Sequence, residues 1–383
     1  MRREPLLMIP GPTEVSTQAL LAMAKPVVSH RDEDFSAFFK QLTEKAKQVF
    51  QTQNDLFILA ASGTGGVEAA VANLTRKGDK VVVPVFGTFS DRVAEAVKRY
   101  GGEVIRIEIP LGEGPTASLI EKTLEKHPDT KVVYIVYNET STGVTVRELP
   151  QIAKIAHKFD AVVVADAISI LGGDELPVDP WEIDVCVTGA QKCLATPPGI
   201  ALVSVSDRAW RLIEREGLST FYFDLSRYKK FFDERGQTPF TPAIPLLFAL
   251  DIALTEILEE GLENRIRRHR LCAQAIYSAV EAWGMTPFAK EPFRSNTVIA
   301  VKYPPNFDDA KFRGLLKRKY RIAVAGGIGI TKGMVFRIGC MGNIGPQDVV
   351  LTIAAMEAVL YEIGYLKEVG KGLAAAVRKL ASL

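Results

Sequence analysis

From about residue 56 to residue 205, the chain alternates short, β-branched apolar runs with longer amphipathic segments. Seven of the runs are expected to form strands: Leu56–Leu59, Lys80–Val85, Val104–Ile109, Lys131–Tyr137, Ala161–Ala165, Asp184–Thr188 and Ile200–Val205. Helical patterns lie between most of them, at Val67–Thr75, Ser90–Tyr100, Ser118–Lys126 and Glu148–Lys158. Repeated strand–helix–strand units form right-handed crossovers, and continuously apolar strands are buried on both faces. The pattern therefore predicts an α/β fold around a mostly parallel seven-stranded sheet.

The pattern changes after residue 217. Phe221 to Thr241 is aromatic and charged without a clear period, so we expect an excursion rather than a core element. Two long helical patterns follow, and then shorter strands and helices: Ala243–Glu259, Asn264–Trp283, Thr297–Val301, Asp308–Lys319, Met334–Ile338 and Pro346–Ile363. We expect an N-terminal arm over residues 1–20, a large domain over 21–265 and a smaller C-terminal α+β domain over 266–383.

Composition excludes several classes of protein. The 47 basic and 45 acidic residues give a net charge of +2, which is no electrostatic footprint for nucleic acid. The four cysteines form no Cys-x-x-Cys pair, which argues against a zinc site or a disulfide scaffold and is typical of a reducing compartment. Neither a signal-peptide core nor an apolar stretch of membrane-spanning length is found. We therefore expect a cytoplasmic protein with no membrane partner.

A lysine and an aspartate follow two neighbouring apolar runs. Asp166 closes the run Val162–Ala165, and Lys192 stands shortly after the run that ends at Thr188. Partial burial penalises both charges unless each has a partner. Pyridoxal phosphate (PLP) needs both groups, since it takes a lysine amine as a Schiff base and a carboxylate against its pyridinium nitrogen. Taken singly, the two residues also fit a surface lysine and a helix N-cap.

Polar residues follow the other strands, at the sheet edge where such folds bind ligands. Ser62-Gly63-Thr64-Gly65 lies between a strand and a helix, where free backbone N–H groups attract an anion such as phosphate. The motif is neither a Walker A loop nor the dinucleotide G-x-G-x-x-G, and a serine-capped turn is the alternative. Gln191, next to Lys192, is a second donor for a phosphate.

Three further positions have two interpretations each. Phe89 fits stacking on a flat ring or a place in the core. Thr142 fits a hydroxyl partner for a ring oxygen, while Glu139 beside it fits a helix cap or a surface acid. Arg337, inside an apolar strand pattern, presents a fork matched to a substrate carboxylate, and a buried structural ion pair is the alternative.

Together these residues resemble the class V aminotransferases of PLP fold type I, and most closely the alanine–glyoxylate / serine–pyruvate aminotransferase group. The matching pieces keep the family's order over nearly the whole chain: Pro10-Gly11-Pro12-Thr13, Ser62-Gly63-Thr64-Gly65, Phe86-Gly87, Glu139-Thr140-Ser141-Thr142-Gly143, Asp166, Leu171-Gly172-Gly173, Gly189-Ala190-Gln191-Lys192, Pro197-Pro198-Gly199 and Phe336-Arg337-Ile338-Gly339. Phe89 and Thr64 stand where some relatives have tryptophan and histidine.

The resemblance implies a role for each matched residue. Lys192 would be the Schiff-base lysine and proton shuttle, and Asp166 would pair with the pyridinium nitrogen. The remaining cofactor contacts would come from Ser62, Gly63, Thr64 and Gln191 at the phosphate, Phe89 and Ile168 on the ring faces, and Thr142 near the phenolic oxygen. Arg337 and Gly11 would bind the substrate. Thr238 and Thr241 would complete the phosphate site of the partner subunit in a homodimer.

The implied activity is PLP-dependent transamination between alanine or serine and glyoxylate or pyruvate, and phosphoserine and phosphonate donors stay open. One alternative is a cysteine desulfurase-like lyase, but the stretch Ile322–Gly329 lacks the nucleophilic cysteine of those relatives. A second is a non-catalytic binding subunit that kept the fold, although such a protein has no physical need for Lys192, Asp166 and Arg337 together.

Overall fold

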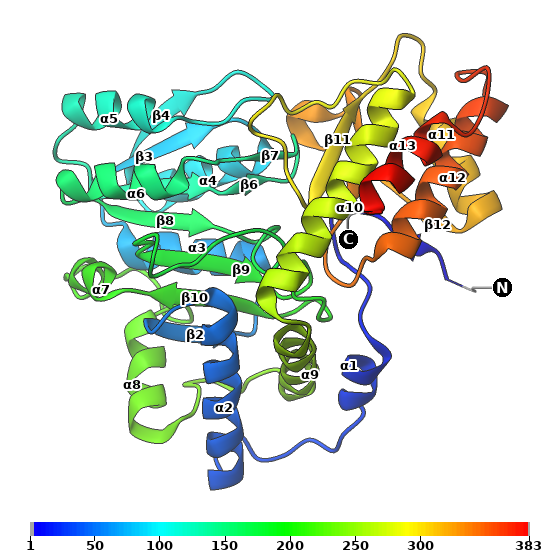
Figure 1. Cartoon of the computed structure of the whole chain (residues 1–383). Helices are drawn as coiled ribbons and strands as arrows, with labels where there is room; N and C mark the ends of the chain where they lie inside the picture. The colour runs from blue at the N-terminus through cyan, green and yellow to red at the C-terminus, as the bar shows by residue number, and fades with distance from the viewer. Residues whose placement is uncertain (1–3, 382–383) are drawn as a thin grey trace.

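The computed structural model describes residues 4–381, and its centre is a seven-stranded sheet (Figure 1). In spatial order the strands are β2 (Asp55–Leu59), β10 (Ala201–Val205), β9 (Val185–Gly189), β8 (Val162–Asp166), β5 (Val132–Val136), β3 (Lys80–Val85) and β4 (Glu103–Glu108). Strand β10 is antiparallel to both of its neighbours, whereas the other neighbouring pairs are parallel. The predicted α/β fold with a mostly parallel seven-stranded sheet is confirmed.

Amphipathic helices cover the sheet where the sequence predicts them. They are α3 (Gly63–Leu74), α4 (Thr88–Arg99), α5 (Ala117–Lys126) and α6 (Leu149–Lys158), and α2 (Glu33–Phe50) and α7 (Asp207–Ile213) join them. Helix α3 packs against β9 and β10, α4 against β3, and α6 against β8. Their buried faces and the valine-rich strands form one large apolar core, which fixes the carboxyl ends of the strands along one edge.

One expectation for the chain after residue 217 is wrong. The stretch Phe221–Thr241 is not a simple excursion, because it contains helix α8 (Leu225–Arg235). The Asp224 side chain caps this helix by accepting from the N–H groups of Ser226 and Arg227, and Gly236 ends it with φ of 66°. Leu225 and Tyr228 are buried in the large core. The charged residues between them obscure the helical period in the sequence.

A second, smaller core lies around the antiparallel sheet β11 (Val298–Lys302), β14 (Val335–Gly339) and β13 (Ala325–Gly326). Its helices are α10 (Leu262–Ala282), α11 (Asp309–Leu315), which continues as a π-helical turn over Leu316–Tyr320, α12 (Pro346–Glu362) and α13 (Lys371–Leu380). Helix α9 (Ile244–Glu260) belongs to the large core. The proposed boundary at residue 265 falls within α10, and the division into domains stays a prediction.

The N-terminal segment connects the two cores (Figure 1). Strand β1 (Leu6–Leu7) pairs with β12 (Ile322–Ala323), and Leu6 and Met8 belong to the smaller core. The backbone N–H of Thr13 then donates to the carbonyl of Gln191 at 3.1 Å. The remaining short elements are α1 (Thr17–Ala22), the hairpin of β6 (Asn138–Glu139) with β7 (Val144–Thr145), and a 3₁₀ turn (Gly329–Thr331). The arm thereby passes beside Lys192.

Candidate active site

A cavity of about 210 Å³, here called the Lys192 cavity, opens at the carboxyl ends of the central strands. Eight of the predicted site residues line it: Ser62, Gly63, Thr64, Phe89, Asp166, Ile168, Gln191 and Lys192. The other lining residues are Val67, Arg92, Val93, Val136, Asn138, Thr140 and Ser169. Residues that are up to 130 positions apart in the sequence therefore meet in one place, as expected for strand ends in a parallel sheet.

The phosphate-type loop has the geometry of an anion site. Ser62 caps helix α3, and its Oγ accepts from the N–H of Gly65 at 3.4 Å. A Cβ on Gly63 would lie 2.9 Å from Cδ1 of Ile168, so any other residue would have to displace that side chain. Gln191 also lines the cavity, and the NH2 group of its amide is the end that can donate to a phosphate. Its Oε1 atom is buried without a hydrogen-bond partner in the described chain, but an amide oxygen only accepts and so is not a phosphate contact. The loop and the Gln191 NH2 group suit a phosphate.

Asp166 is buried and Lys192 is half-buried, and neither forms an ion pair within the described residues. Burial lowers the pKa of Lys192 to about 8, and the nearby Arg337 charge adds to this effect. Burial raises the pKa of Asp166 to about 7, although its carboxylate accepts from the N–H of Ile168 at 3.0 Å. Two groups shifted toward neutrality in one cavity are typical of a chemical site.

The N-terminal arm holds the amine of Lys192. Its Nζ donates to the carbonyl oxygen of Pro10. Gly11 has φ of 90°, and a Cβ there would lie 2.5 Å from Cδ of Lys192. Gly11 is therefore adjacent to the amine, as a substrate-binding position requires, but it does not line the cavity.

Phe89 and Glu139 lie at the start of helix α4. The Phe89 ring lines the cavity, and the guanidinium carbon of Arg92 lies 4.8 Å from the ring centroid. The carboxylate of Glu139 is fully buried and accepts from the N–H groups of Phe89 and Ser90 at 3.0 and 2.9 Å. Of its two interpretations, Glu139 is the helix-capping acid. It fixes the position of Phe89 by satisfying the free N–H groups of α4.

The structure places Thr142 away from the cavity. Its side chain is fully buried, and its hydroxyl has only a long contact of 3.5 Å to the carbonyl of Glu139. Thr140, two residues earlier, lines the cavity instead, and its hydroxyl donates to Oγ of Ser169 at 2.8 Å. The two threonines therefore have different surroundings, since Thr140 lines the cavity and Thr142 does not. The contact to the cofactor hydroxyl stays a prediction, and the position of Thr140 favours it over Thr142.

Arg337 stands on β14 with its guanidinium held by backbone carbonyls. Nε donates to Gly326 at 2.9 Å and Nη1 to Thr140 at 3.1 Å. Burial lowers its pKa to about 10, and no carboxylate of the described residues lies within ion-pair distance of it. The structural ion pair considered from the sequence is therefore absent from residues 4–381. A guanidinium without a counter-ion beside Lys192 is suited to an incoming carboxylate.

Thr238 and Thr241 do not reach the Lys192 cavity of their own chain. Arg31 holds their loop by donating to the carbonyls of Thr238 and Pro239 at 2.6 and 3.2 Å. Thr241 is exposed, whereas Thr238 is buried and donates its hydroxyl to the carbonyl of Phe240 at 2.7 Å. In this conformation Thr241 is the threonine that is accessible to another subunit.

Comparison with known proteins agrees with this geometry. The family model "Aminotransferase class-V" matches residues 16–341. The chain belongs to the class-V aminotransferase family. It is 45% identical to an uncharacterized aminotransferase of Methanocaldococcus jannaschii, over 97% of both chains. It is 35% identical to the serine–glyoxylate aminotransferase of Methylorubrum extorquens, over 97% of this chain and 94% of that protein.

Two relatives are named as hydrogenase subunits instead of aminotransferases. The soluble hydrogenase small subunit of Synechococcus is 39% identical over the full length of both chains. Among solved structures, the ureidoglycine–glyoxylate aminotransferase of Bacillus subtilis is similar with a TM-score of 0.94 and 32% identity, over 100% of this chain and 99% of that one. Within residues 4–381 no group of three or more histidine, cysteine, aspartate or glutamate side chains could hold a metal ion.

This class-V aminotransferase is a PLP-dependent transaminase of fold type I. The residues present fit the cofactor, because the cavity combines an anion cradle, a lysine of lowered pKa and a buried carboxylate. The desulfurase-like alternative is disfavoured, since each of the four cysteines is buried as a free thiol and none is exposed as a nucleophile. In the described chain no helix is long and apolar enough to span a membrane.

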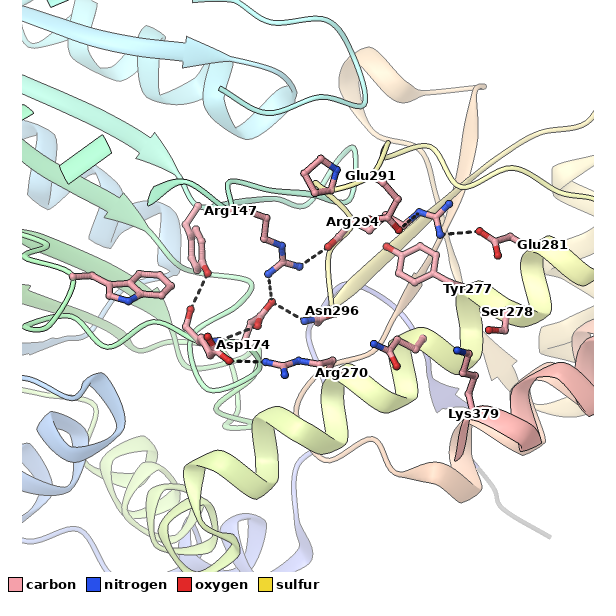
Figure 2. A pocket seen from close by; sticks show the side chains of 15 residues that line it. Arg147, Asp174, Arg270, Tyr277, Ser278, Glu281, Glu291, Arg294, Asn296 and Lys379 are labelled. Atoms are coloured by element: carbon pink, nitrogen blue, oxygen red, sulfur yellow. Dashed lines mark hydrogen bonds and ion pairs between the residues drawn. The ribbon is translucent and has the colours of Figure 1, made fainter. Parts of the chain in front are cut away.

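A larger cavity of about 570 Å³, here called the Asp174 cleft, contains none of the predicted residues (Figure 2). Its arginines pair with carboxylates: Arg147 with Asp174 at 2.7 Å, Arg270 with Glu175 at 2.6 Å, and Arg294 with Glu281 at 2.7 Å. The Lys192 cavity differs because its charged groups lack such partners. Size alone would therefore identify the wrong site.

The polar wall of the Lys192 cavity has no role predicted from the sequence. Asn138 and Thr140 belong to the polar strand-end residues that the sequence indicates, whereas Ser169, three residues after β8, was not among them. Arg92 lies one helical turn after Phe89 and is exposed at the cavity. Its i, i+3 spacing from Phe89 was the available signal.

Proposed function

We propose that this class-V aminotransferase transfers the amino group of a small amino acid, alanine or serine, to glyoxylate, with pyruvate as a second acceptor. The observation that carries the proposal is the guanidinium of Arg337, which is close enough to Lys192 to lower its pKa and is held by backbone carbonyls alone, one of them from Thr140 in the cavity wall. Arg337 itself does not line the cavity of about 210 Å³. One arginine fork suits one carboxylate. Glyoxylate is the acceptor in the names of the relatives from Methylorubrum extorquens and Bacillus subtilis.

Each residue has a defined part in this proposal. Bound PLP supplies an electron sink for the charge that develops when a substrate Cα–H bond breaks. Lys192 would hold the cofactor, and its amine would accept the proton from the substrate Cα. In the cofactor-free chain burial lowers its pKa to about 8, which favours the neutral, proton-accepting form. Asp166 would pair with the ring nitrogen, whose positive charge would favour the ionised carboxylate.

The remaining residues bind and orient. Ser62, Gly63, Thr64 and Gln191 would hold the phosphate at the N-terminus of α3. Phe89 and Ile168 would cover the two ring faces, and Thr140 would serve the hydroxyl contact first assigned to Thr142. Arg337 would orient the substrate carboxylate so that the Cα–H bond faces Lys192.

The proposal includes a homodimer in which the loop of Thr238 and Thr241 completes the partner's phosphate site. Arg31 anchors that loop and Thr241 is exposed, which supports a contact across subunits. Thr238 would contribute through its backbone or after breaking its bond to Phe240. A cytoplasmic location is also part of the proposal, and it agrees with the free cysteines.

A half-reaction screen tests the substrate assignment. The purified PLP form is mixed with single amino acids, and conversion to the pyridoxamine form is followed by absorbance; the pyridoxamine form is then mixed with glyoxylate, pyruvate or 2-oxoglutarate. We expect alanine or serine to convert the first form and glyoxylate to restore it fastest. A strong preference for phosphoserine, or for 2-oxoglutarate as acceptor, would refute the assignment. A colourless protein that ignores added PLP would favour a non-catalytic binding subunit.

A further inference from the structure

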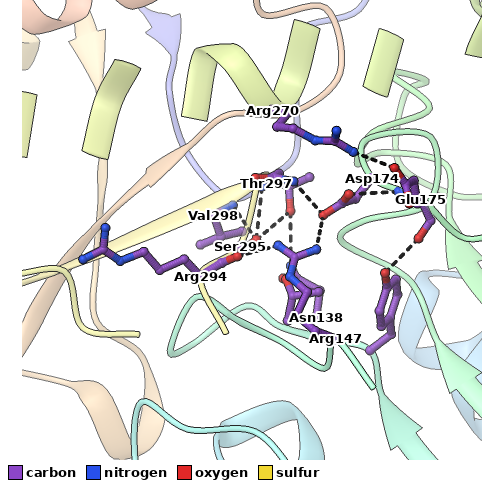
Figure 3. A network of polar contacts seen from close by, with 12 residues as sticks. Asn138, Arg147, Asp174, Glu175, Arg270, Arg294, Ser295, Thr297 and Val298 are labelled. Carbon is purple, nitrogen blue, oxygen red and sulfur yellow. Dashed lines mark hydrogen bonds and ion pairs between the residues drawn. The ribbon is translucent and has the colours of Figure 1, made fainter. Parts of the chain in front are cut away.

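A hydrogen-bond network joins the Asp174 cleft to the wall of the Lys192 cavity (Figure 3). Its centre is the segment Phe293–Thr297, here called the crossing segment, which precedes β11. The crossing segment lies against β7: the N–H of Thr145 donates to Phe293 at 2.8 Å, and the N–H of Ser295 donates to Gly143 at 3.1 Å. It therefore contacts the loops of the large sheet just before the chain enters the smaller one.

Asp174 anchors this segment from the cleft side. Its carboxylate is 3% exposed and accepts from Nη1 of Arg147 at 2.7 Å and from Nδ2 of Asn296 at 2.9 Å. Arg147 also donates to the carbonyl of Arg294 at 2.5 Å. Although burial lowers the pKa of Arg147, the charge and hydrogen bond of Asp174 outweigh this effect and the net shift is upward. One buried ion pair thus holds two points of the crossing segment.

Thr297, the last residue of the crossing segment, connects the segment to the wall of the cavity. The hydroxyl of Thr297 donates to the carbonyl of Ser169 at 2.8 Å and accepts from Nδ2 of Asn138 at 3.2 Å. The same amide donates its second hydrogen to Oγ of Ser169 at 2.7 Å, while Oδ1 of Asn138 accepts from Thr145 at 2.7 Å. Every donor and acceptor of the Asn138 amide is satisfied, so its orientation is fixed.

Both ends of the active site depend on these contacts. Thr140 donates to Ser169 on the cofactor side, and its carbonyl accepts from Arg337 on the substrate side. The carbonyl of Thr297 also accepts from the N–H of Cys340 at 2.8 Å, beside the strand β14 that carries Arg337. We propose that Asp174 is a positioning residue of this transaminase: by fixing the crossing segment, it sets Asn138 and Thr140 for the cofactor and Arg337 for the substrate carboxylate.

The test compares Asp174→Asn with Asp79→Asn. Asp79 is a matched control, since it also forms a mostly buried ion pair, with Arg215 at 2.6 Å. It lies just before the amino end of β3, whereas the cavity lies at the carboxyl ends of the strands. Apoenzymes are titrated with PLP, KM and kcat for glyoxylate are measured on the PLP-saturated enzymes, and thermal unfolding is recorded for all forms. We expect Asp174→Asn to weaken PLP binding and to raise KM about tenfold, with a smaller change in kcat, because couplings through packed networks reach about this size.

Asp79→Asn should lower the unfolding temperature comparably while leaving PLP affinity and KM unchanged. If Asp174→Asn fails to fold, Asn296→Ala is tested instead, because it removes one hydrogen bond and keeps the ion pair. The dissociation constant of PLP and KM for glyoxylate should then each rise about threefold. Unchanged PLP affinity and KM in the variant that folds would overturn the proposal. The PLP titration needs no substrate, so this result stands apart from the choice of glyoxylate as acceptor.

Discussion

The Lys192 cavity and the Asp174 cleft differ in how their charged groups are paired. In the cleft, which is more than twice as large, the arginines lie within 2.7 Å of carboxylates. In the cavity, the half-buried Lys192 and the buried Asp166 have pKa values displaced toward each other, and Arg337 nearby has only carbonyl partners. The fold satisfies charges where they hold the structure together and leaves them unsatisfied where a cofactor and a substrate complete the site.

The largest expected effect concerns Asp166. A buried carboxyl whose pKa is about 7 in the folded apoenzyme, against an ordinary 3.8, destabilises the folded state as pH rises from about 4 to 7. Asp166→Asn removes this pH-dependent destabilisation. It should increase the free energy of unfolding of the apoenzyme at pH 7.5 by up to about 4 kcal/mol, while abolishing most activity. Chemical denaturation at pH 4 and 7.5 measures the difference. An equal effect at both pH values would show that Asp166 carries no unpaired charge in the apoenzyme.

A second experiment compares Arg337 with an arginine that already has a partner. Arg337→Lys removes the planar fork, and KM for glyoxylate should rise on the order of 100-fold because charge-assisted bonds to the carboxylate are lost. Arg313→Lys is the control, since Arg313 pairs with Asp309 on α11. Steady-state kinetics with glyoxylate measure KM for both variants, and Arg313→Lys should keep the KM of the parent enzyme. Similar KM values for Arg337→Lys and the parent enzyme would contradict a carboxylate role.

The two threonines of the Glu139–Gly143 turn give a smaller and sharper contrast. Thr140→Val should weaken PLP binding about fivefold, since a lost neutral hydrogen bond costs about 1 kcal/mol. Thr142→Val should leave PLP affinity unchanged, because that side chain is buried away from the cavity. Titration of both apoenzymes with PLP measures the difference. The reverse ranking would restore the assignment made from the sequence.

The smallest effect is expected at the most exposed ion pair of the three in the Asp174 cleft. Arg270 and Glu175 form an ion pair whose side chains are 44% and 61% exposed, and such pairs contribute about 0–1 kcal/mol. Arg270→Ala should therefore change the free energy of unfolding by less than about 0.5 kcal/mol and leave KM and PLP affinity as they are. A clear loss of activity in this variant would mean that the cleft takes part in the reaction.

Much of the fold and of the site was predictable from the sequence, for physical reasons. Strands buried on both faces, such as Val162–Asp166, produce continuous apolar runs, and the residues at their carboxyl ends must converge. Helix α8 was missed because its buried residues are few and stand among charged ones. Thr140 and Thr142 could not be told apart, because only the folded structure shows which of them lines the cavity. The links of Asn138 to Ser169 and Thr297 exist only in three dimensions.

The central claim is that Lys192 carries the cofactor, and borohydride reduction tests it most directly. The PLP-loaded enzyme is reduced and digested, and the peptides are analysed by mass spectrometry for the pyridoxyl phosphate adduct. The adduct should be found on the peptide with Gln191-Lys192-Cys193, and Lys192→Ala should carry none. An adduct on a different lysine, or equal labelling of the Lys192→Ala protein, would contradict the assignment.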